Sequence, residues 1–147
     1  MEWMNDLQHF WDFMKRRHEA AVEYVSGNAL PTNELSTTEF PSTLFAMTGG
    51  VERGHERVAV KYFKTAQDWE VGGDSRFEIV QLYATKGIGY WVGYQHVTIW
   101  KRDRDEAEPV TMRVTEIYRR KGSDWKLVHR HSDPLAEDTS DPPGSEN

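Results

Sequence analysis

The four segments that fill the second half of the chain constrain its fold most strongly. They cover residues 76–84, 89–101, 110–120 and 125–132, and each is rich in β-branched and aromatic side chains. Short stretches with glycine or charged residues separate them, which is typical of antiparallel strands joined by turns. The pattern predicts a four-stranded meander whose last two strands form a β-hairpin.

The first half of the chain has helical periodicity instead. Apolar residues recur at steps of three, four and seven from Trp3 to Val25, and a similar spacing recurs from His55 to Trp69. Between these helices we expect one helical turn at 31–37, an extended stretch at 42–47 and a glycine-rich turn at 48–54. Helices followed by a meander predict an α+β fold, with the helices on one face of an antiparallel sheet.

Length and charge set the domain organisation. A chain of 147 residues suits a single domain with its own core, which we place at residues 1–135. Residues 136–147 contain four acids and no base, so we expect a disordered acidic tail. The formal net charge of −6 becomes nearly neutral without this tail. We therefore expect no nucleic-acid partner, because no basic stripe is available for phosphates.

Several classes of protein are excluded by composition. The chain has no cysteine, so disulfides, thiolate nucleophiles and cysteine-bound zinc are excluded. No apolar run approaches the ~20 residues of a membrane span. The first ten residues also lack the pattern of a signal peptide. We expect a soluble, cytoplasmic protein with neither a membrane partner nor a cofactor.

The final hairpin carries polar side chains where an alternating strand would carry apolar ones. We interpret this as one face of the hairpin lining a cavity. A four-residue loop, which we favour, pairs Thr115 with Arg130 and Glu116 with His129. A loop that differs by one residue brings Arg113 and Thr115 beside the histidines of the last strand. In both registers Arg113 and Thr115 share a face.

The order of these elements resembles the SnoaL-like, or ketosteroid-isomerase-like, branch of the nuclear transport factor 2-like superfamily. The resemblance runs from Leu7 to Pro134 and includes RVTEIYRR, WKLVHRHSDP, GNALP, GGVERG and GYWVGYQHV. The hairpin is also similar to the association domain of calcium/calmodulin-dependent kinases. The resemblance implies a cone-shaped fold, with N-terminal helices packed on a strongly curved antiparallel sheet around a cavity. It also implies homodimers formed through the sheet.

Gln95 is the single polar residue in a row that is otherwise apolar and includes Trp91. A buried amide without a partner costs about 1–3 kcal/mol, so Gln95 needs either a structural partner or a cavity with a ligand. An amide binds and orients a ligand but does not act as a general base. Relatives often carry a carboxylate near this point, and Gln95 departs from that pattern.

Arg113 is the strongest single candidate for an anion-binding residue. A guanidinium that points inward from a strand needs an acid, carbonyl groups or an anionic ligand. It either pairs with Asp133 or binds a carboxylate or enolate-like oxygen in the cavity, with Thr115 beside it. We expect Arg113, Thr115 and Gln95 around one cavity, and we add Arg130 as a ligand-binding candidate.

His129 and His131 lie two residues apart on a strand and point the same way, followed by Asp133. They could hold a metal, serve a structural or dimer-interface role, or act in acid/base chemistry. No third histidine stands at a suitable spacing, so we expect no metal. We name these three residues as the catalytic candidates.

The aromatic residues Tyr24, Trp69 and Trp91 lie on internal faces, as core residues or as walls of the cavity. The hypothesis for function is a small-molecule-binding domain of unknown specificity, whose cavity suits an anionic or carbonyl-bearing ligand. One alternative is an isomerase, cyclase or dehydratase that uses histidine as general acid/base. A second alternative is a homo-oligomerisation module with a vestigial pocket. An aromatic outer face around Tyr94 and Trp100 predicts a homodimer.

Overall fold

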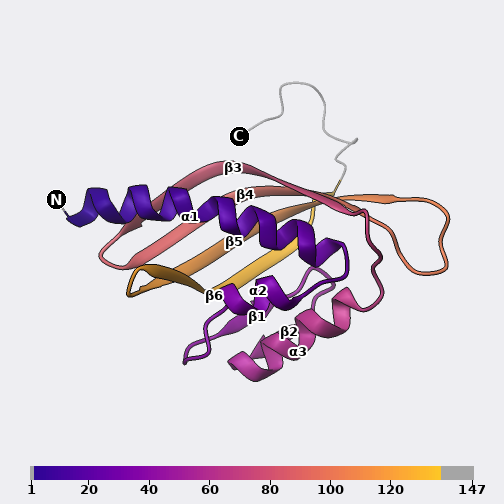
Figure 1. Cartoon of the computed structure of the whole chain (residues 1–147), viewed down its shortest axis with the longest axis horizontal. Helices are drawn as coiled ribbons and strands as arrows, with labels where there is room; N and C mark the ends of the chain where they lie inside the picture. Colours follow the sequence, from indigo (N-terminus) through magenta and orange to yellow (C-terminus); the bar gives the residue numbers. More distant parts are fainter. Residues whose placement is uncertain (1, 137–147) are drawn as a thin grey trace.

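The structure is a computed structural model that describes residues 2–136, with side chains from residue 6 onward. The predicted acidic tail lies outside these residues, apart from Ala136. The helices and strands, shown in Figure 1, are α1 (Glu2–Val25), α2 (Leu30–Leu35), β1 (Thr43–Phe45), β2 (Val51–Arg53), α3 (His55–Ala66), β3 (Asp74–Thr85), β4 (Ile88–Ile99), β5 (Glu108–Lys121) and β6 (Asp124–Pro134). The two long helices and the four meander strands lie where the periodicity of the sequence predicts them. The predicted glycine-rich turn at 48–54 is only partly a turn, because Val51–Arg53 form the short strand β2.

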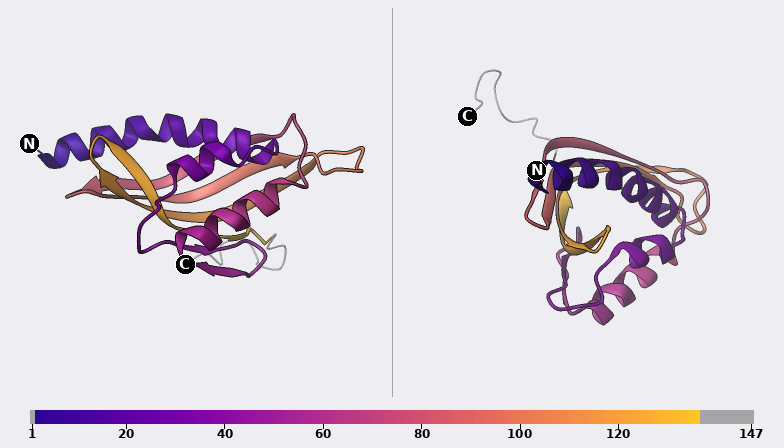
Figure 2. Two further views of the ribbon diagram at one scale, coloured as in Figure 1. Left: turned by 60° about the horizontal axis from the view of Figure 1, so that its bottom comes forward. Right: turned by 60° about the vertical axis from the view of Figure 1, so that its left-hand side comes forward.

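The strands form one sheet in the order β2-β1-β6-β5-β4-β3. All neighbouring strands are antiparallel except β1 and β6, which are parallel. Figure 2 shows the sheet curving around an interior that the three helices close. The expected fold class is confirmed: helices from the first half of the chain pack on a strongly curved, mostly antiparallel sheet.

A β-bulge bends β3. Val80 is the extra residue, inserted between Ile79 and Gln81 in the pairing with β4. The two strands come so close here that a Cβ on Gly93 would lie 2.1 Å from the carbonyl oxygen of Glu78. Only glycine fits at this position. Because a bulge increases the local twist of a strand, it helps the long sheet to curve.

A second bulge, in β6, changes the register of the final hairpin. Near the turn, the pairing is the one that the favoured four-residue loop predicts. Val128 is then an extra residue, and beyond it Glu116 pairs with Arg130 instead of His129. The predicted pairing of Thr115 with Arg130 is wrong for the same reason. A bulge shifts the register by one residue, so each of these side chains acquires a different neighbour.

The larger part of the core lies between α1 and the sheet. Phe10 and Phe13 of α1 contact Tyr118, with ring centroids 5.2 Å apart, and Phe10 also contacts Trp125 at 5.1 Å. All four side chains are buried. Large aromatic side chains contribute most of the burial energy of such a core, which fixes α1 on the sheet.

A smaller cluster forms where α3 packs beside β1 and the start of α2. Val58, Tyr62 and Ala66 of α3 are its buried members on that helix. Tyr24 and Trp69 pack against both clusters. The two clusters therefore meet at these aromatic rings, and the space between them is not completely filled.

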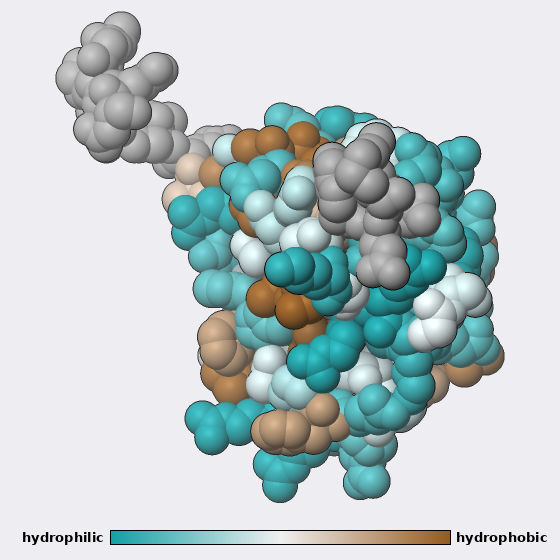
Figure 3. All heavy atoms as spheres, turned by 90° about the vertical axis from the view of Figure 1, so that its left-hand side faces the viewer, coloured by the Kyte–Doolittle hydropathy of each residue, from teal (hydrophilic) through white to brown (hydrophobic). Residues whose placement is uncertain are grey.

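One end of the molecule carries the β3–β4 and β5–β6 turns. Its surface is mostly hydrophilic, with hydrophobic groups scattered among polar ones in the part that is not drawn in grey (Figure 3). Among residues 2–136, no helix is long and apolar enough to cross a membrane.

Candidate ligand-binding cavity

A cavity of about 290 Å³ lies between α1, α3 and the inner face of the sheet. Its walls are mostly apolar, and they include the following residues: Ala21, Tyr24, Val25, Leu44, Met47, Tyr62, Trp69, Val97, Ile99, Val110 and Met112. Its volume is at the lower end of the ~300–1,000 Å³ that is typical of small-molecule pockets.

Helical and strand periodicity place the lining residues in rows. Arg17, Ala21 and Val25 follow one another at intervals of four along α1, so they lie on one face of that helix. On β4, the row is Gln95, Val97 and Ile99, because alternate residues of a strand face the same side. The two rows run in the same direction and give the cavity a polar end and an apolar remainder.

The residues at the other end of the cavity are more exposed. Thr48 and Glu108 line it and are exposed, which marks the open end. Glu108 forms an ion pair with Lys101, with an Nζ–Oε2 distance of 2.9 Å. The charges of this pair therefore balance each other at the mouth.

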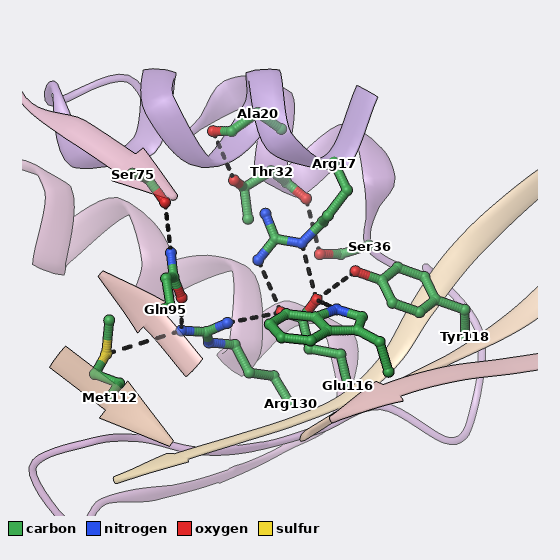
Figure 4. A network of polar contacts seen from close by, with 11 residues as sticks. Arg17, Ala20, Thr32, Ser36, Ser75, Gln95, Met112, Glu116, Tyr118 and Arg130 are labelled. Carbon is green, nitrogen blue, oxygen red and sulfur yellow. Dashed lines mark hydrogen bonds and ion pairs between the residues drawn. The ribbon is translucent and has the colours of Figure 1, made fainter. Parts of the chain in front are cut away.

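The polar end is organised by Glu116, whose carboxylate is fully buried and accepts five hydrogen bonds (Figure 4). Arg17 donates from Nε at 2.9 Å and from Nη2 at 2.7 Å. Arg130 donates from Nη1 at 2.7 Å, Trp91 from its indole N–H at 2.8 Å and Tyr118 from its hydroxyl at 2.5 Å. No acceptor position of this carboxylate is left for a substrate.

The electrostatics keep Glu116 ionised. Burial alone would raise the pKa of Glu116, but the charges and hydrogen bonds of Arg17 and then of Arg130 hold it well below its usual range. Burial also raises the pKa of Tyr118 well above that of a free tyrosine, so its hydroxyl stays protonated and donates. Glu116 is thus the counter-charge of two arginines and not a general base.

Gln95 extends this network to β3. Arg130 donates from Nη2 to the side-chain oxygen of Gln95 at 2.6 Å, and Gln95 donates from Nε2 to the hydroxyl of Ser75 at 3.0 Å. The side-chain amide of Gln95 is therefore not left without partners, as one of the two predicted alternatives required. Gln95 also lines the cavity, as the other alternative required. Its orientation is fixed, because Arg130 can only donate.

Four of the predicted ligand-binding residues, Tyr24, Trp69, Gln95 and Arg130, line this cavity. Trp91 is not among the lining residues, and its indole N–H donates a hydrogen bond to Glu116. Burial raises the pKa of Tyr24 above its ordinary value and that of Tyr62 to about 12, so both phenols remain neutral.

The expectation that Arg113 and Thr115 surround this cavity together with Gln95 is wrong. Gln95 pairs directly with Met112 in the sheet, so Met112 shares its face and Arg113 points to the opposite side. The side chain of Arg113 is 62% exposed and forms a two-bonded ion pair with Asp133 at 2.6 and 2.8 Å. Of the two alternatives for Arg113, the geometry supports the ion pair with Asp133 and not a contact with a ligand in the cavity.

The catalytic candidates also lie on this outer face. His129 contacts the hydroxyl of Thr43 through Nδ1 at 2.7 Å, and Phe45 packs edge-on against both His129 and His131. Burial and then the neighbouring His131 lower the pKa of His129. Neither histidine nor Asp133 lines the cavity. Within residues 2–136, no group of three or more His, Cys, Asp or Glu residues is arranged to hold a metal.

Arg17 and the central role of Glu116 are not among the predicted site residues. Arg17 continues the apolar stripe of α1, three positions after Met14 and four before Ala21. Arg17 could therefore have been identified from the sequence, as a charged residue at a helical position that the apolar stripe predicts to be buried. The role of Glu116 could not be identified in this way, because the bulge at Val128 pairs Glu116 with Arg130 and not with the residue that a regular hairpin predicts.

No known family model matches the sequence, and no curated protein sequence matches it. Solved structures do match. A candidate dehydratase of the NTF2-like family from Streptomyces avermitilis superposes with a TM-score of 0.72 at 14% identity, over 89% of this chain and 96% of that one. An NTF2-like superfamily protein from Salmonella enterica gives 0.72 at 15% identity, over 95% and 96%.

A candidate calcium/calmodulin-dependent protein kinase II association domain from Xanthomonas campestris gives a TM-score of 0.65 at 13% identity, over 86% of each chain. Proteins with different described roles thus share this architecture, so the likeness defines a fold and not an activity. This chain has the fold of the nuclear transport factor 2-like superfamily.

Proposed function

We propose that this protein is a SnoaL-like small-molecule-binding domain whose ligand has an apolar body and an anionic or carbonyl-bearing end. The observation that carries the proposal is the position of two buried arginines, Arg17 and Arg130, at one end of a mostly apolar cavity. The apolar body would lie along Val97 and Ile99, and the polar end would meet the guanidinium groups.

The energetic cost of this arrangement supports a role in binding. Buried ion pairs often stabilise a fold no more than apolar residues of the same size would, because the charges lose their hydration. Glu116 holds both guanidinium groups rigidly, which reduces the entropy that a ligand must lose to order them. A fixed donor array beside an apolar wall is typical of a recognition site.

An enzyme that works through histidine has less support. The residues that line the cavity include no histidine, and their one carboxylate, Glu108, is paired with Lys101 at the mouth. The buried carboxylate of Glu116 accepts five hydrogen bonds and has a strongly lowered pKa. The donors suit binding and polarisation of an oxygen atom, whereas a proton acceptor is missing from the lining residues.

A screen for binding tests this proposal. Small aromatic and aliphatic acids, ketones and amides would be added to isotope-labelled protein, and binding would be followed through the indole N–H signal of Trp69. Ala21→Leu fills the cavity from α1 and should abolish binding, whereas Ala59→Leu on α3, outside the lining, should not. Absence of binding by all compounds, or equal binding by Ala21→Leu, would contradict the proposal.

We also propose that two copies pair through the outer face of the sheet. Tyr94, His96 and Thr98 alternate with the inward row of β4, Trp100 follows directly after this strand, and all four remain partly exposed. Pairing of two such faces would remove aromatic surface from water. Light scattering should give twice the chain mass of 17.1 kDa at micromolar concentration. Tyr94→Asp should lower this mass to that of one chain, and a wild-type monomer would refute pairing.

A further inference from the structure

We infer that the cavity selects a singly charged carboxylate over a neutral carbonyl compound and over a doubly charged phosphate ester. This inference rests on the proposed function and narrows its ligand class. It follows from the number of charges that face the cavity and from one donor of Arg17 that has no acceptor.

The buried charges do not balance. Arg17 and Arg130 are 4% and 9% exposed, and guanidinium groups stay protonated in proteins. Both contact the same oxygen of Glu116, which is 0% exposed, at 2.7 Å. Two positive groups share one negative group, so the polar end of the cavity carries one excess positive charge.

The other charged residues of the lining do not cancel this excess. Lys61 of α3 also lines the cavity, but it is partly exposed, so water screens its charge and it does not belong to the buried excess. At the mouth, Lys101 and Glu108 form a pair that is neutral as a unit. Among the lining residues that the structure describes, no further acid is present. A buried charge without a counter-charge is costly, and a bound anion would remove that cost.

One donor at this end is also unused. Arg17 binds Glu116 through Nε and Nη2, while its Nη1 is buried and has no hydrogen-bond partner within residues 2–136 (Figure 4). The guanidinium group lies over the ring of Phe77, with its central carbon 5.2 Å from the ring centroid, and an aromatic ring accepts no strong hydrogen bond. A buried charged donor without an acceptor is rare in native proteins. A carboxylate oxygen is a suitable acceptor for it.

Charge matching decides among the ligand classes. A neutral ketone or amide can accept the hydrogen bond but leaves the excess charge uncompensated. A phosphate monoester carries about −1.5 to −2 at pH 7 and would place extra negative charge in an apolar space. A carboxylate supplies one negative charge and two acceptor oxygens. Val97, Ile99 and Val110 then require that the rest of the ligand be aliphatic or aromatic.

The experiment uses sets of three compounds with the same body and different ends. For phenyl, cyclohexyl and butyl bodies, the propanoic acid, its amide and the ethyl phosphate would be titrated into the wild-type protein by calorimetry at pH 7. We expect the acid to bind about tenfold or more tightly than the amide, as for a charged hydrogen bond, and more tightly than the phosphate.

The outcomes separate the inference from the proposed function. Equal or tighter binding of the amide or the phosphate would overturn the selection of a single charge, while binding itself would still support a small-molecule site. If none of these compounds binds, and the wider screen also fails, the proposed function is wrong and the inference falls with it.

Two variants test whether the preference for the acid depends on the charge of Arg17. Arg17→Met removes the excess charge but leaves Glu116 with Arg130, Trp91 and Tyr118, so the fold should persist. The preference for acid over amide should then disappear, because the acid loses both a hydrogen bond and its counter-charge whereas the amide loses a hydrogen bond alone. Arg16→Met is the matched control, since Arg16 is the neighbouring helical residue and its side chain is 57% exposed. Equal losses for acid and amide in Arg17→Met would show that Arg17 acts through shape, which would overturn the inference.

Discussion

The two faces of the final hairpin each carry an arginine paired with an acid, and the two pairs differ in almost every other property. On the inner face Arg130 contacts Glu116 in a buried network that also includes Arg17. On the outer face Arg113 contacts Asp133, and both side chains are exposed to water. The pairs are neighbours on the same two strands.

Burial explains the difference. Water screens the outer pair, so Arg113 and Asp133 have little influence on each other beyond their own hydrogen bonds. The inner charges are shielded from water, so each depends on the other and on the surrounding donors. An ion pair of the same residue types is therefore a replaceable surface contact on one face and an essential part of the interior on the other.

The largest expected effect is that of removing the inner acid. Glu116→Ala leaves Arg17 and Arg130 buried without a counter-charge, and it should lower the free energy of unfolding by about 3–5 kcal/mol. Urea denaturation followed by tryptophan fluorescence measures this. Asp133→Ala on the outer face is the control and should change the midpoint little. A similar loss in both variants would remove the distinction between the faces.

The inner acid should also make the stability of the protein depend on pH. The folded-state pKa of Glu116 is lowered, so the unfolded chain binds a proton at this residue more readily than the folded protein does. The stabilisation is fully present above the unfolded pKa of about 4.3 and is lost as the pH falls below it. Between about pH 5 and pH 2 the wild-type protein should lose stability more steeply than Glu116→Gln. Parallel curves of unfolding free energy against pH would contradict this.

A smaller effect is expected at Gln95. Gln95→Leu leaves Nη2 of Arg130 without its oxygen acceptor and Ser75 without its donor, but it keeps the apolar packing. A loss of about 1–3 kcal/mol is expected from the unpaired buried donor. Thermal unfolding checks this, with Thr98→Val as a control for a partly exposed position on the same strand. An unchanged or raised melting temperature would mean that Gln95 does not orient Arg130.

The smallest effect is expected at Arg113. Because Arg113 is exposed and its pair with Asp133 is screened, Arg113→Met should leave both ligand affinity and the melting temperature nearly unchanged. Calorimetric titration and thermal unfolding of the same sample measure both. A marked loss of ligand affinity would show that the outer face takes part in binding after all.

The sequence was sufficient for the fold because periodicity depends on many residues at once. The stripes of α1 and α3 and the four β-rich segments each contain several consistent positions, so single exceptions do not change the result. The site was harder to predict. Gln95, Tyr24 and Trp69 could be placed on internal faces from alternation and helical spacing alone, and all three line the cavity.

The errors at the site have one main cause. Arg113 was assigned to the face of Gln95, although that assignment requires the register between β4 and β5, which no local pattern contains. Arg130 lines the cavity, but opposite Glu116 and not beside Thr115, because of the bulge at Val128. Register and bulges depend on contacts between strands, so a single sequence leaves them undetermined.

The bulge at Val128 also affects how this hairpin should be compared with those of its relatives. In a regular strand, a residue two places after Leu127 would share its face, but here Arg130 does so from three places away. A relative without the extra residue would match this chain only if its alignment has a gap at Val128. Without that gap, an interior arginine would be aligned with a surface position and a surface histidine with an interior one. Deleting Val128 should keep every side chain on its present face while straightening β6, so the deletion would separate the curvature of the sheet from the composition of the cavity.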